Sequence, residues 1–462
     1  MTPIMAARGR KGRLRNKPVG MVRGVSIALV LALGLGQAMA GDFFTLKGHG
    51  GPVKGIAAAA DGRILTASFD NSVGLWRDGV PLWLEGHSAA VNEVLFLPDG
   101  RILSGGDDFE LRVWDPDTGA TRAMNGHAGK IMGLAVSPDG RRAASASWDG
   151  QIGLWDLSAH DGSAEVRPVF LNGHTSGVNA VAFSNDGAVL YSGSTDGSLR
   201  VWDVATGAQI RQLVHNGFGI NRLVLNEADG WIAYGAIDGV TRVIDVATSA
   251  QVRDLTLERR PILALAASPD FGLLAIGDGE GYISIVETET WGFVADFRAT
   301  LRGPVWALAF SPDGTNVHAG GLDTAMYSWP VTGLRNGERM VAEVPSYLVP
   351  ASAVSNGERQ YNRKCSICHA LGPDGQRRAG PTLHGIFGRK AGTLARYTYS
   401  ETLRRSSVVW GDDTIDALFD QGPDAFITGS KMPEQRITDP QDRADLIAFL
   451  RTATLEPDNR EE

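Results

Sequence analysis

Cysteine is scarce in this sequence, with two residues in 462. A framework of several disulfides, which small exported domains use in place of a large core, is therefore excluded. The two cysteines, Cys365 and Cys368, are three positions apart, and His369 directly follows the second. A disulfide across two intervening residues closes a small strained ring and serves redox exchange within a βαβ pattern, which the sequence lacks. We therefore interpret both cysteines as free for another chemistry.

Long apolar runs are also scarce, and the one at residues 25–36 has the features of an export signal. Residues 1–24 carry seven basic residues and no acid, and Ala38-Met39-Ala40 provides a small-residue cleavage site. About 14 apolar residues are few for a membrane span, which needs roughly 20. We predict a signal peptide at 1–40, cleaved after about Ala40, a periplasmic location and no integral membrane span in the mature chain. Retention of the segment as an uncleaved anchor is the alternative.

Basic residues are fewer than acidic residues in this sequence. The chain has 44 Lys and Arg against 52 Asp and Glu, a net charge of −8 at pH 7, and loss of residues 1–40 would make it more acidic. This balance argues against nucleic acid and anionic membrane surfaces as main partners. The length allows two or three domains, and 43% hydrophobic with 21% charged residues is ordinary for soluble globular protein.

Glycine, in contrast, is abundant, with 58 residues spread beside Asp and Asn, which indicates many tight turns and short strands. Segments such as "LRVWD" and "IGLWD" recur about every 40 residues, and an acid stands six positions before the last apolar residue of each. Period-two strands joined by Asp-Gly turns predict seven four-stranded antiparallel units. The units end at Trp76, Trp114, Trp155, Trp202, Ile244, Val286 and Trp329, and their acids are Asp70, Asp108, Asp149, Asp196, Asp238, Glu280 and Asp323.

Over residues 42–333 these repeats resemble the WD-repeat β-propeller family. The resemblance implies an all-β, seven-bladed propeller around a central channel, with the strand at 42–46 completing the seventh blade and leaving no exposed edge. It also implies that the histidine of each Gly-His pair bonds the turn aspartate of its unit. Units five to seven lack such a pair, so we expect packing to hold them. The implied pairs are His87 with Asp108, His127 with Asp149, and His174 with Asp196.

The repeats offer no catalytic constellation. Their histidines, His49 included, show no metal-ligand spacing. We expect the tryptophans at the repeat ends to be buried and Trp148 and Trp231 to lie at the surface. The propeller is therefore predicted to be a scaffold or a partner-binding surface.

The pattern C-x-x-C-H at Cys365, Cys368 and His369 is the attachment signature of a c-type haem. On one helix, two thiols three residues apart can add to two vinyl groups on one porphyrin edge, and the next residue then reaches the iron. The sequence therefore predicts one covalent haem c. Helix signals surround the motif: a capping box at Ser355 and Glu358, a cap at Asp412 or Asp413 for a helix through Phe419, and a third start at Asp439 and Pro440.

Residues 354–455 resemble a class I cytochrome c of the mitochondrial and photosynthetic-bacterial type. The segments "GERQYNRKCSICHALGP", "GPTLHGIFGRKAGT", "YTYSETL", "GSKMP" and "DPQDRADLIAFL" follow that pattern in order. The resemblance implies a small all-α domain with Cys365 and Cys368 as the haem thioethers and His369 as the proximal ligand. Residues 334–353 then form a linker, and 456–462 an acidic tail.

The same resemblance assigns supporting roles. Gly357 and Tyr361 of the first helix are expected to pack against Leu446 and Phe449 of the last, where glycine permits close approach. The carbonyl of Pro381 is expected to accept the N–H of His369 and fix its ring. Three further residues are expected near the haem propionates, Arg389, Tyr399 and Trp410.

The second iron ligand follows from the residues themselves. Met432 is the one methionine after Met340 and lies in "GSKMP", a loop that cannot continue a helix. A thioether favours reduced iron, so a His/Met pair suits an electron carrier of high potential. His384 is the rival ligand, although the resembled family places a non-ligating histidine there. An open sixth position, suited to peroxidase or gas-binding chemistry, is the third alternative.

Two positions depart from the mitochondrial pattern. Phe419 stands where a tyrosine contacts the ligand sulfur, and Glu434 stands where an aromatic residue guards the haem edge. Both leave the potential and the docking face open. Basic residues expected near that edge, Lys364, Lys390 and Lys431, either steer an acidic redox partner or are ordinary solvated charges.

Together these patterns predict an exported c-type cytochrome that transfers single electrons, with the propeller docking a redox partner protein. An electron-transfer protein is favoured over a substrate-turning enzyme. The alternative is a periplasmic oxidoreductase whose propeller binds a substrate or cofactor and passes electrons to the haem. A pure interaction protein is disfavoured because every attachment and ligand residue is present.

Overall fold

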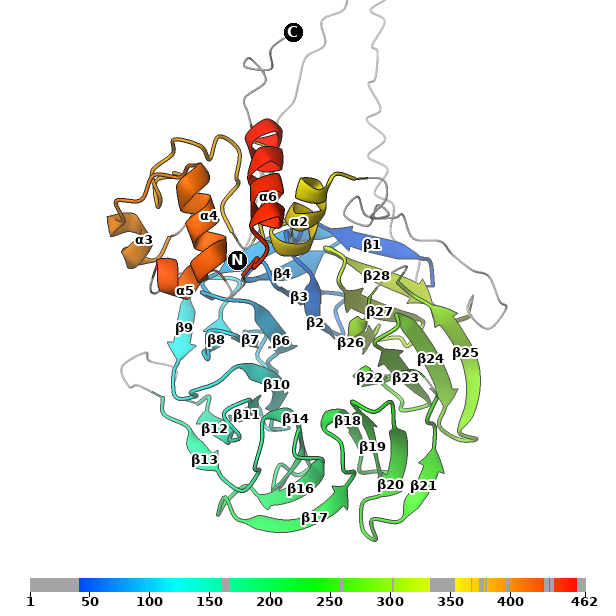
Figure 1. Ribbon diagram of the computed structural model, residues 1–462. Helices are drawn as coiled ribbons and strands as arrows, with labels where there is room; N and C mark the ends of the chain where they lie inside the picture. The colour runs from blue at the N-terminus through cyan, green and yellow to red at the C-terminus, as the bar shows by residue number, and fades with distance from the viewer. Residues whose placement is uncertain are drawn as a thin grey trace, which may run out of the picture. The chain divides into compact units, whose positions relative to one another are not determined.

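A computed structural model describes residues 41–454 apart from 159–165, 258, 260, 301–302, 333–353, 367, 374–377, 379, 396, 398, 428–431 and 433–435. The predicted signal peptide, linker and acidic tail therefore lie outside the described residues. Within them the chain forms an all-β domain followed by a small helical domain (Figure 1).

The β domain consists of seven four-stranded antiparallel sheets arranged around a central opening (Figure 1). The sequential order within each sheet follows from short turns between period-two strands, as predicted. Blade by blade, from the inner strand outward, the strands are β2 Val53–Ala58, β3 Ile64–Ser68, β4 Ser72–Arg77 and β5 Val80–Glu85; β6 Val91–Phe96, β7 Ile102–Gly106, β8 Leu111–Trp114 and β9 Thr121–Met124; β10 Ile131–Val136, β11 Arg142–Ser147, β12 Ile152–Asp156 and β13 Val169–Leu171; β14 Val178–Phe183, β15 Val189–Ser194, β16 Ser198–Asp203 and β17 Gln209–His215; β18 Ile220–Asn226, β19 Trp231–Ala236, β20 Thr241–Asp245 and β21 Gln251–Asp254; β22 Ile262–Ala267, β23 Leu273–Asp278, β24 Tyr282–Glu287 and β25 Gly292–Arg298; and β26 Val305–Phe310, β27 Asn316–Gly321, β28 Ala325–Pro330 and β1 Phe44–Lys47.

The ring closes through the first strand. β1 pairs antiparallel with β28, with Phe44 opposite Ser328 and Lys47 opposite Ala325, so the N-terminal strand completes the seventh blade as predicted. Closure ties the two ends of the domain together and covers what would be an open sheet edge.

Apolar residues fill the spaces between neighbouring sheets. The tryptophans that end the repeats, for example Trp155 and Trp202, are fully buried in these layers, as expected. Trp148 is 52% exposed, as expected, but Trp231 is 6% exposed, so the expectation of a surface position for it was wrong. Trp231 begins β19 and packs edge-on against Trp291, with ring centroids 5.3 Å apart, which explains its burial.

Four blades contain the same chain of polar contacts. In the third blade His127 Nδ1 lies 2.7 Å from Asp149 and its Nε2 lies 2.7 Å from Ser145 Oγ, which accepts the indole N–H of Trp155 at 2.8 Å. The predicted pairs of His87 and His174 have the same geometry, and His49 bonds Asp70 likewise. The hydroxyl ten residues before each tryptophan completes the chain, a signal that the sequence analysis missed. The four hydroxyls are Thr66, Ser104, Ser145 and Ser192.

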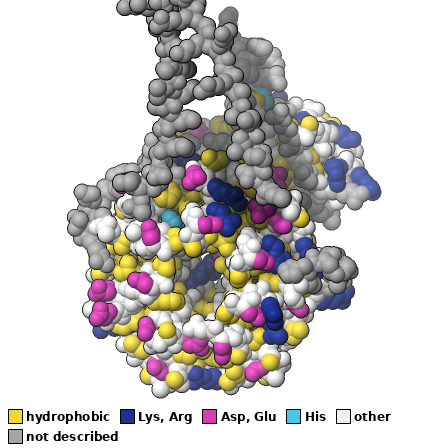
Figure 2. Space-filling model, turned by 180° about the vertical axis from the view of Figure 1, so that it is seen from behind, with side chains coloured by type: hydrophobic (Ala, Val, Ile, Leu, Met, Phe, Trp, Pro, Cys, Tyr) yellow, Lys and Arg dark blue, Asp and Glu magenta, His cyan; other side chains and the backbone are white. Residues whose placement is uncertain are grey.

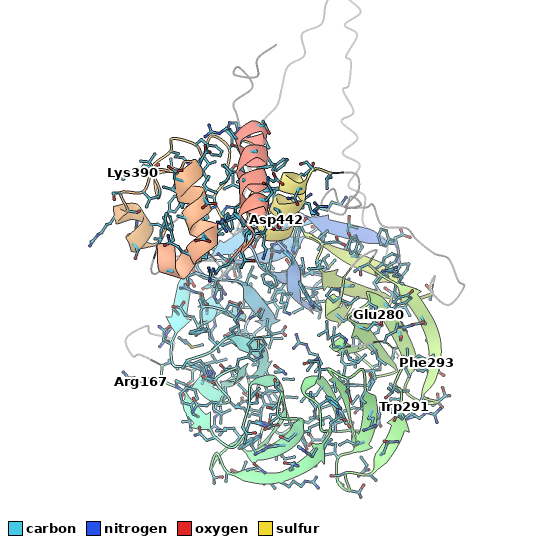
Figure 3. All side chains as sticks on the ribbon, viewed as in Figure 1. Arg167, Glu280, Trp291, Phe293, Lys390 and Asp442 are labelled. Carbon is cyan, nitrogen blue, oxygen red and sulfur yellow. The ribbon has the colours of Figure 1, made fainter. Side chains whose placement is uncertain are left out.

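The sixth blade replaces this chain with other polar contacts, so the expectation that packing holds it instead was wrong for that blade. In the sixth blade Arg259 bridges Asp278 at 2.7 Å and Asp296. Glu280, the acid counted in that repeat, is exposed (Figure 3), and buried Asp278 takes its role. In the seventh blade Ala319 stands where the hydroxyl would be, and the buried indole N–H of Trp329 has no hydrogen-bond partner within the described residues.

The second domain contains five described helices: α2 Asn356–Lys364, α3 Glu401–Arg405, α4 Asp412–Gln421, α5 Pro423–Phe426 and α6 Pro440–Ala453. Ser355 and Asp439 cap α2 and α6 by accepting backbone N–H groups, as predicted. The cap predicted at Asp412 or Asp413 was placed one or two residues late. Gly411 is the N-cap of α4, and its N–H donates to Thr414 Oγ1 at 2.8 Å. Both acids therefore lie in the first turn of the helix, where a negative charge interacts favourably with the helix dipole.

Helices α2 and α6 cross at very short range. A Cβ added to Gly357 would lie 2.0 Å from the carbonyl oxygen of Asp445 and 2.7 Å from Phe449 Cβ, so only glycine fits at the crossing. Next to it the rings of Tyr361 and Phe449 pack with centroids 5.6 Å apart, and Leu446 is fully buried. The predicted helix contact is therefore confirmed. No helix in the described part of the chain has the length and apolar character needed to cross a membrane.

Asp149→Ala is expected to lower the free energy of unfolding of the propeller by about 1–3 kcal/mol, because His127 Nδ1 and two backbone N–H groups lose their acceptor. Burial opposes the charge of Asp149, but these hydrogen bonds outweigh it and lower the carboxyl pKa from 3.8 to about 2. The stabilisation is therefore present above pH 4 and lost as the pH falls toward 2.

Urea unfolding followed by tryptophan fluorescence measures this effect, since ten of the eleven tryptophans lie in the propeller. The matched control is Asp117→Ala, which removes an 85% exposed carboxylate and should change little. Equal unfolding midpoints for the two variants would contradict the stabilising role of the polar chain.

Candidate functional site

The end of α2 places three chemically active side chains together. Backbone N–H groups of Cys365 and His369 donate to the carbonyls of Tyr361 and Cys365, both at 2.8 Å, so the chain makes one more helical turn through the C-x-x-C-H motif. Both cysteines are free thiols. Burial raises the pKa of Cys365 to about 12 and also raises that of Cys368, so both are protonated at neutral pH.

A structural zinc site needs thiolates and four protein ligands. Within the described residues no group of three or more His, Cys, Asp or Glu side chains could hold a metal ion.

His369 is held in one orientation. Its Nδ1 donates to the carbonyl of Pro381 at 2.7 Å, where the resemblance had placed that contact, and its own carbonyl accepts the hydroxyl of Tyr361 at 2.8 Å. The ring lies against Gly380, where an added Cβ would come within 2.3 Å of the ring. Burial lowers the pKa of His369, so the imidazole is neutral and Nε2 carries a lone pair.

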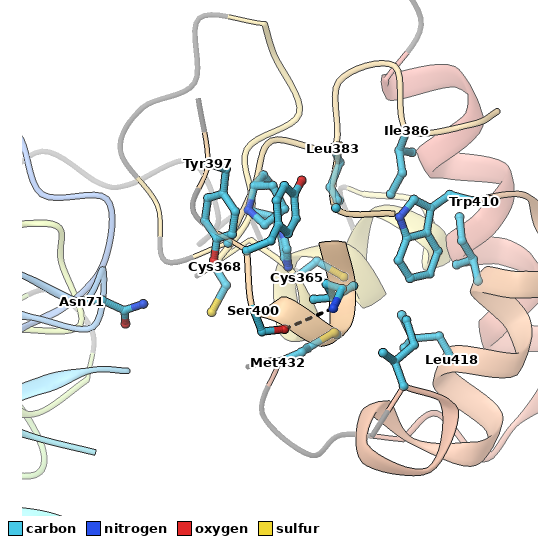
Figure 4. A pocket seen from close by; sticks show the side chains of 18 of the residues that line it. Asn71, Cys365, Cys368, Leu383, Ile386, Tyr397, Ser400, Trp410, Leu418 and Met432 are labelled. Atoms are coloured by element: carbon cyan, nitrogen blue, oxygen red, sulfur yellow. Dashed lines mark hydrogen bonds between the residues drawn. The ribbon is translucent and has the colours of Figure 1, made fainter. Parts of the chain in front are cut away.

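The side chains of the motif line a mainly apolar cavity (Figure 4), and most of its wall residues belong to the helical domain. Its walls come from the loop after the motif, from the segment before α3, and from α4. Helix α4 contributes its buried face through Ile415, Leu418 and Phe419. Other wall residues are Leu383, Ile386, Tyr397, Tyr399, Leu403 and Trp410.

Met432 also lines this cavity and is half-buried in the same apolar cluster (Figure 4). Of the described histidines, His369 is the one at the cavity wall. The backbone carbonyl of His384 accepts the guanidinium of Arg389 at 2.8 Å. The cavity thus brings Met432, rather than the rival His384, together with His369.

The three residues expected near the propionates all line the cavity. Arg389 donates to the carbonyls of Thr382 and His384 at 2.8 Å, which fixes the loop behind Pro381. Trp410 bonds the same loop through its backbone, donating to the carbonyl of Arg389 at 2.9 Å. Tyr399 packs edge-on against Tyr397, with ring centroids 4.8 Å apart.

Sequence reasoning missed two residues of this site. Tyr397 lies in the quoted segment "YTYSETL" but was given no role, and burial raises its pKa to about 12, so it stays a neutral hydrogen-bond donor. Gly380, beside Pro381, was also missed, although a glycine between two chain turns is a common signal of close approach. Phe419, one of the departures from the mitochondrial pattern, is a buried wall residue, whereas Glu434 and Lys431 lie outside the described residues.

The chemistry of these groups fits a haem. The porphyrin is flat and apolar, and the cavity offers an apolar lining with one neutral imidazole and one thioether. Two thiols on one turn suit addition to one edge of the macrocycle, and Arg389 and the two tyrosines provide donors for its acidic groups. Cys365, Cys368, His369 and Met432 are therefore the residues that would hold the group.

Comparison with known families agrees with both domains. A model of the WD domain, G-beta repeat, matches residues 42–77, 81–115, 120–156, 166–203 and 295–329. The stretch between 203 and 295, which forms most of the fifth and sixth blades, lies outside these matches, whereas the seventh repeat is matched although it too lacks the Gly-His pair. A cytochrome c model matches residues 354–454.

Curated cytochromes c match a stretch about as long as the helical domain. Cytochrome c of Sesamum indicum is 40% identical over 106 residues, which are 23% of this chain and 94% of that protein. Cytochrome c of Chlamydomonas reinhardtii is 37% identical over 105 residues, covering 23% of this chain and 93% of that protein. Cytochrome c of Gibberella zeae is 34% identical over 101 residues, which are 22% of this chain and 94% of that protein. Through its C-terminal domain the chain therefore belongs to the cytochrome c family, and this domain follows a seven-bladed propeller of WD repeats.

Proposed function

We propose that this protein is an exported carrier of single electrons with one covalent haem c, attached at Cys365 and Cys368 and ligated by His369 and Met432. The observation that carries the proposal is the position of His369, whose ring is fixed by Pro381 at the wall of a cavity that also contains both thiols and Met432. When bound, the haem takes up and releases one electron at a time.

The side chains around the cavity suit this role. The carbonyl of Pro381 fixes the tautomer of His369 and raises the basicity of the opposite nitrogen. Apolar walls limit the water that would reorganise when the charge changes, and a thioether from Met432 favours the reduced state. Tyr397, Tyr399 and Arg389 are polar groups on otherwise apolar walls and would orient the acidic edge of the group.

The propeller is proposed to dock the redox partner protein. Each antiparallel blade places its second-to-third strand loop, and the loop into the next blade, at the same end of the ring. Four apolar side chains in such loops are 40% to 58% exposed and lie at the same end of the ring. They define a loop face: Phe109, Trp148, Phe218 and Ile237.

The first test of the cofactor and of export uses one preparation. The full chain is expressed in a host that matures cytochromes c, and the periplasmic and cytoplasmic fractions are purified separately. We expect one covalent haem per chain by pyridine haemochrome analysis, in the periplasmic protein, and none after deletion of residues 1–40. A haem that acid-acetone extracts would contradict covalent attachment, and equal loading in both fractions would contradict export.

Met432→Ala is expected to lower the midpoint potential by on the order of 0.1 V, because the thioether that favours reduced iron is lost. The methionine-to-iron band should disappear from the spectrum of the oxidised protein, and carbon monoxide should then bind the reduced protein. His384→Ala is the matched control and should retain the wild-type spectrum and potential. If His384→Ala produced these changes and Met432→Ala did not, the ligand assignment would be wrong.

The loop face is tested by Phe218→Ser combined with Ile237→Ser, two exposed residues. The backbone N–H of Ile237 donates to the carbonyl of Gly219, the residue next to Phe218, at 2.9 Å. Reduction of the haem by a respiring extract of the source cells should slow by about fivefold or more, since exposed aromatic and aliphatic residues contribute strongly to interfaces. Reduction by ascorbate should not change. The control pair, Val80→Ser with Val252→Ser on outer strands, should behave as wild type. Equal rates for both pairs with the extract would exclude docking at this face.

A further inference from the structure

The inner strands of the propeller share a local irregularity. In all seven, the pairing with the second strand shifts register after the first residue. A bulge of this kind re-aims the extra residue. The residue that follows the bulge is Gly55, Gly133, Ala180, Ala264 or Ala307 in five blades, and these small residues leave room in the central opening.

Two blades break this pattern with long charged residues. The second blade has Glu93 at the position of these small residues, and the fifth blade has Arg222. Both line a central cavity of about 200 Å³, together with Lys54 and Trp306, which are bulge residues of the first and seventh blades. Figure 2 shows basic side chains inside the opening of the ring. Charged groups are costly in such a place unless something pairs with them.

The protein itself pairs these charges incompletely. The guanidinium of Arg222 reaches the carbonyls of Met132, Asn179 and Asn221 only at 3.3–3.5 Å, longer than ordinary N–H to oxygen hydrogen bonds, and Glu93 at 3.9 Å. Bulge asparagines of neighbouring blades, in contrast, make full bonds across blade boundaries, such as Asn179 Nδ2 to the carbonyl of Ile220 at 2.9 Å. The weak contacts of Arg222 are therefore specific to this residue.

Lys54 is the least satisfied of the group. Its ammonium has no hydrogen-bond or ion-pair partner within the described part of the chain and lies over the ring of Trp306, 4.6 Å from the centroid. Burial, with repulsion by Arg222, lowers its pKa to about 8. Nearby Lys130 and Asp107 neutralise each other across 2.5 Å. The inner cluster therefore contains two cations and one carboxyl group, that of Glu93, whose pKa is raised by burial. This leaves an excess of at least one positive charge.

We propose that this central cavity binds a small monocarboxylate, held between Lys54 and Arg222. One negative charge would balance the excess, and a carboxylate matches the fork of an arginine and a single ammonium donor. Apolar neighbours, among them Ile56, Leu134 and Leu308, would contact a short hydrocarbon tail. The volume is sufficient, because a cavity of about 150 Å³ in another protein accommodates benzene. This site is separate from the haem cavity and does not depend on the proposed electron transfer.

Isothermal titration calorimetry with butyrate on the full haem-loaded chain tests the proposal. We expect saturable binding of one butyrate per chain, and no binding of the uncharged isostere butyramide. Lys54→Met should weaken butyrate binding by about tenfold or more, because a charged hydrogen bond is lost. Lys54→Arg, which keeps the charge, should retain binding within a few fold. Lys47→Met, at an exposed position of β1, is the charge-matched control and should bind as wild type.

Each contrary result identifies a different error. Absence of saturable butyrate binding to the wild type overturns the proposal, as does equal loss of affinity in Lys54→Met and Lys54→Arg. Stronger binding of phosphate or chloride than of butyrate would overturn the choice of a carboxylate. An unchanged circular dichroism spectrum and unfolding midpoint of Lys54→Met, without butyrate, show that the variant is folded and that the loss lies in the site.

Discussion

The helical domain depends on the close crossing of α2 and α6 at Gly357. Because the backbones approach to the point where a Cβ would overlap Asp445, the direction of α2 is fixed along its length. The helix ends at Lys364, and the next turn carries Cys365, Cys368 and His369. The single hydrogen bond from His369 to Pro381 then sets the ring. A contact between two helices, remote from the imidazole, thus determines where the ring of His369 lies.

In the propeller, a repeated set of polar contacts fixes the positions of the loops between blades. Seven sheets can close only if each loop between blades has a defined position, and in four blades a chain from aspartate through histidine and hydroxyl to tryptophan fixes that loop. The later blades reach the same end with different groups, such as Arg259 between two aspartates. Blade geometry therefore tolerates changes of this chemistry, and within the described residues the buried indole N–H of Trp329 in the seventh blade has no hydrogen-bond partner.

Much of this could be predicted from the sequence because the signals are periodic or local. Strand repeats, helix caps and the C-x-x-C-H spacing each act over a few residues, so the blades, α2, α6 and the haem cavity were predicted. The errors have a different origin. The burial of Trp231 depends on Trp291, sixty residues later, and the Arg259 bridge depends on three separate segments. The central charges could not be predicted either, because Glu93 and Arg222 belong to different blades and meet only when the ring closes.

The cavity at the C-x-x-C-H motif and the central cavity of the propeller differ in the charge of the groups that line them. In the cavity that contains the C-x-x-C-H motif, burial keeps the thiol of Cys365, the imidazole of His369 and the hydroxyl of Tyr397 neutral. The propeller cavity instead gathers charges from the first, second and fifth blades and leaves them under-paired. An anion bound there would bridge inner strands from opposite sides of the ring and would favour the closed ring over any opened form, since binding to one state stabilises it. The strand that closes the ring, β1, belongs to the blade next to Lys54, so occupancy of the centre and closure of the edge would support each other.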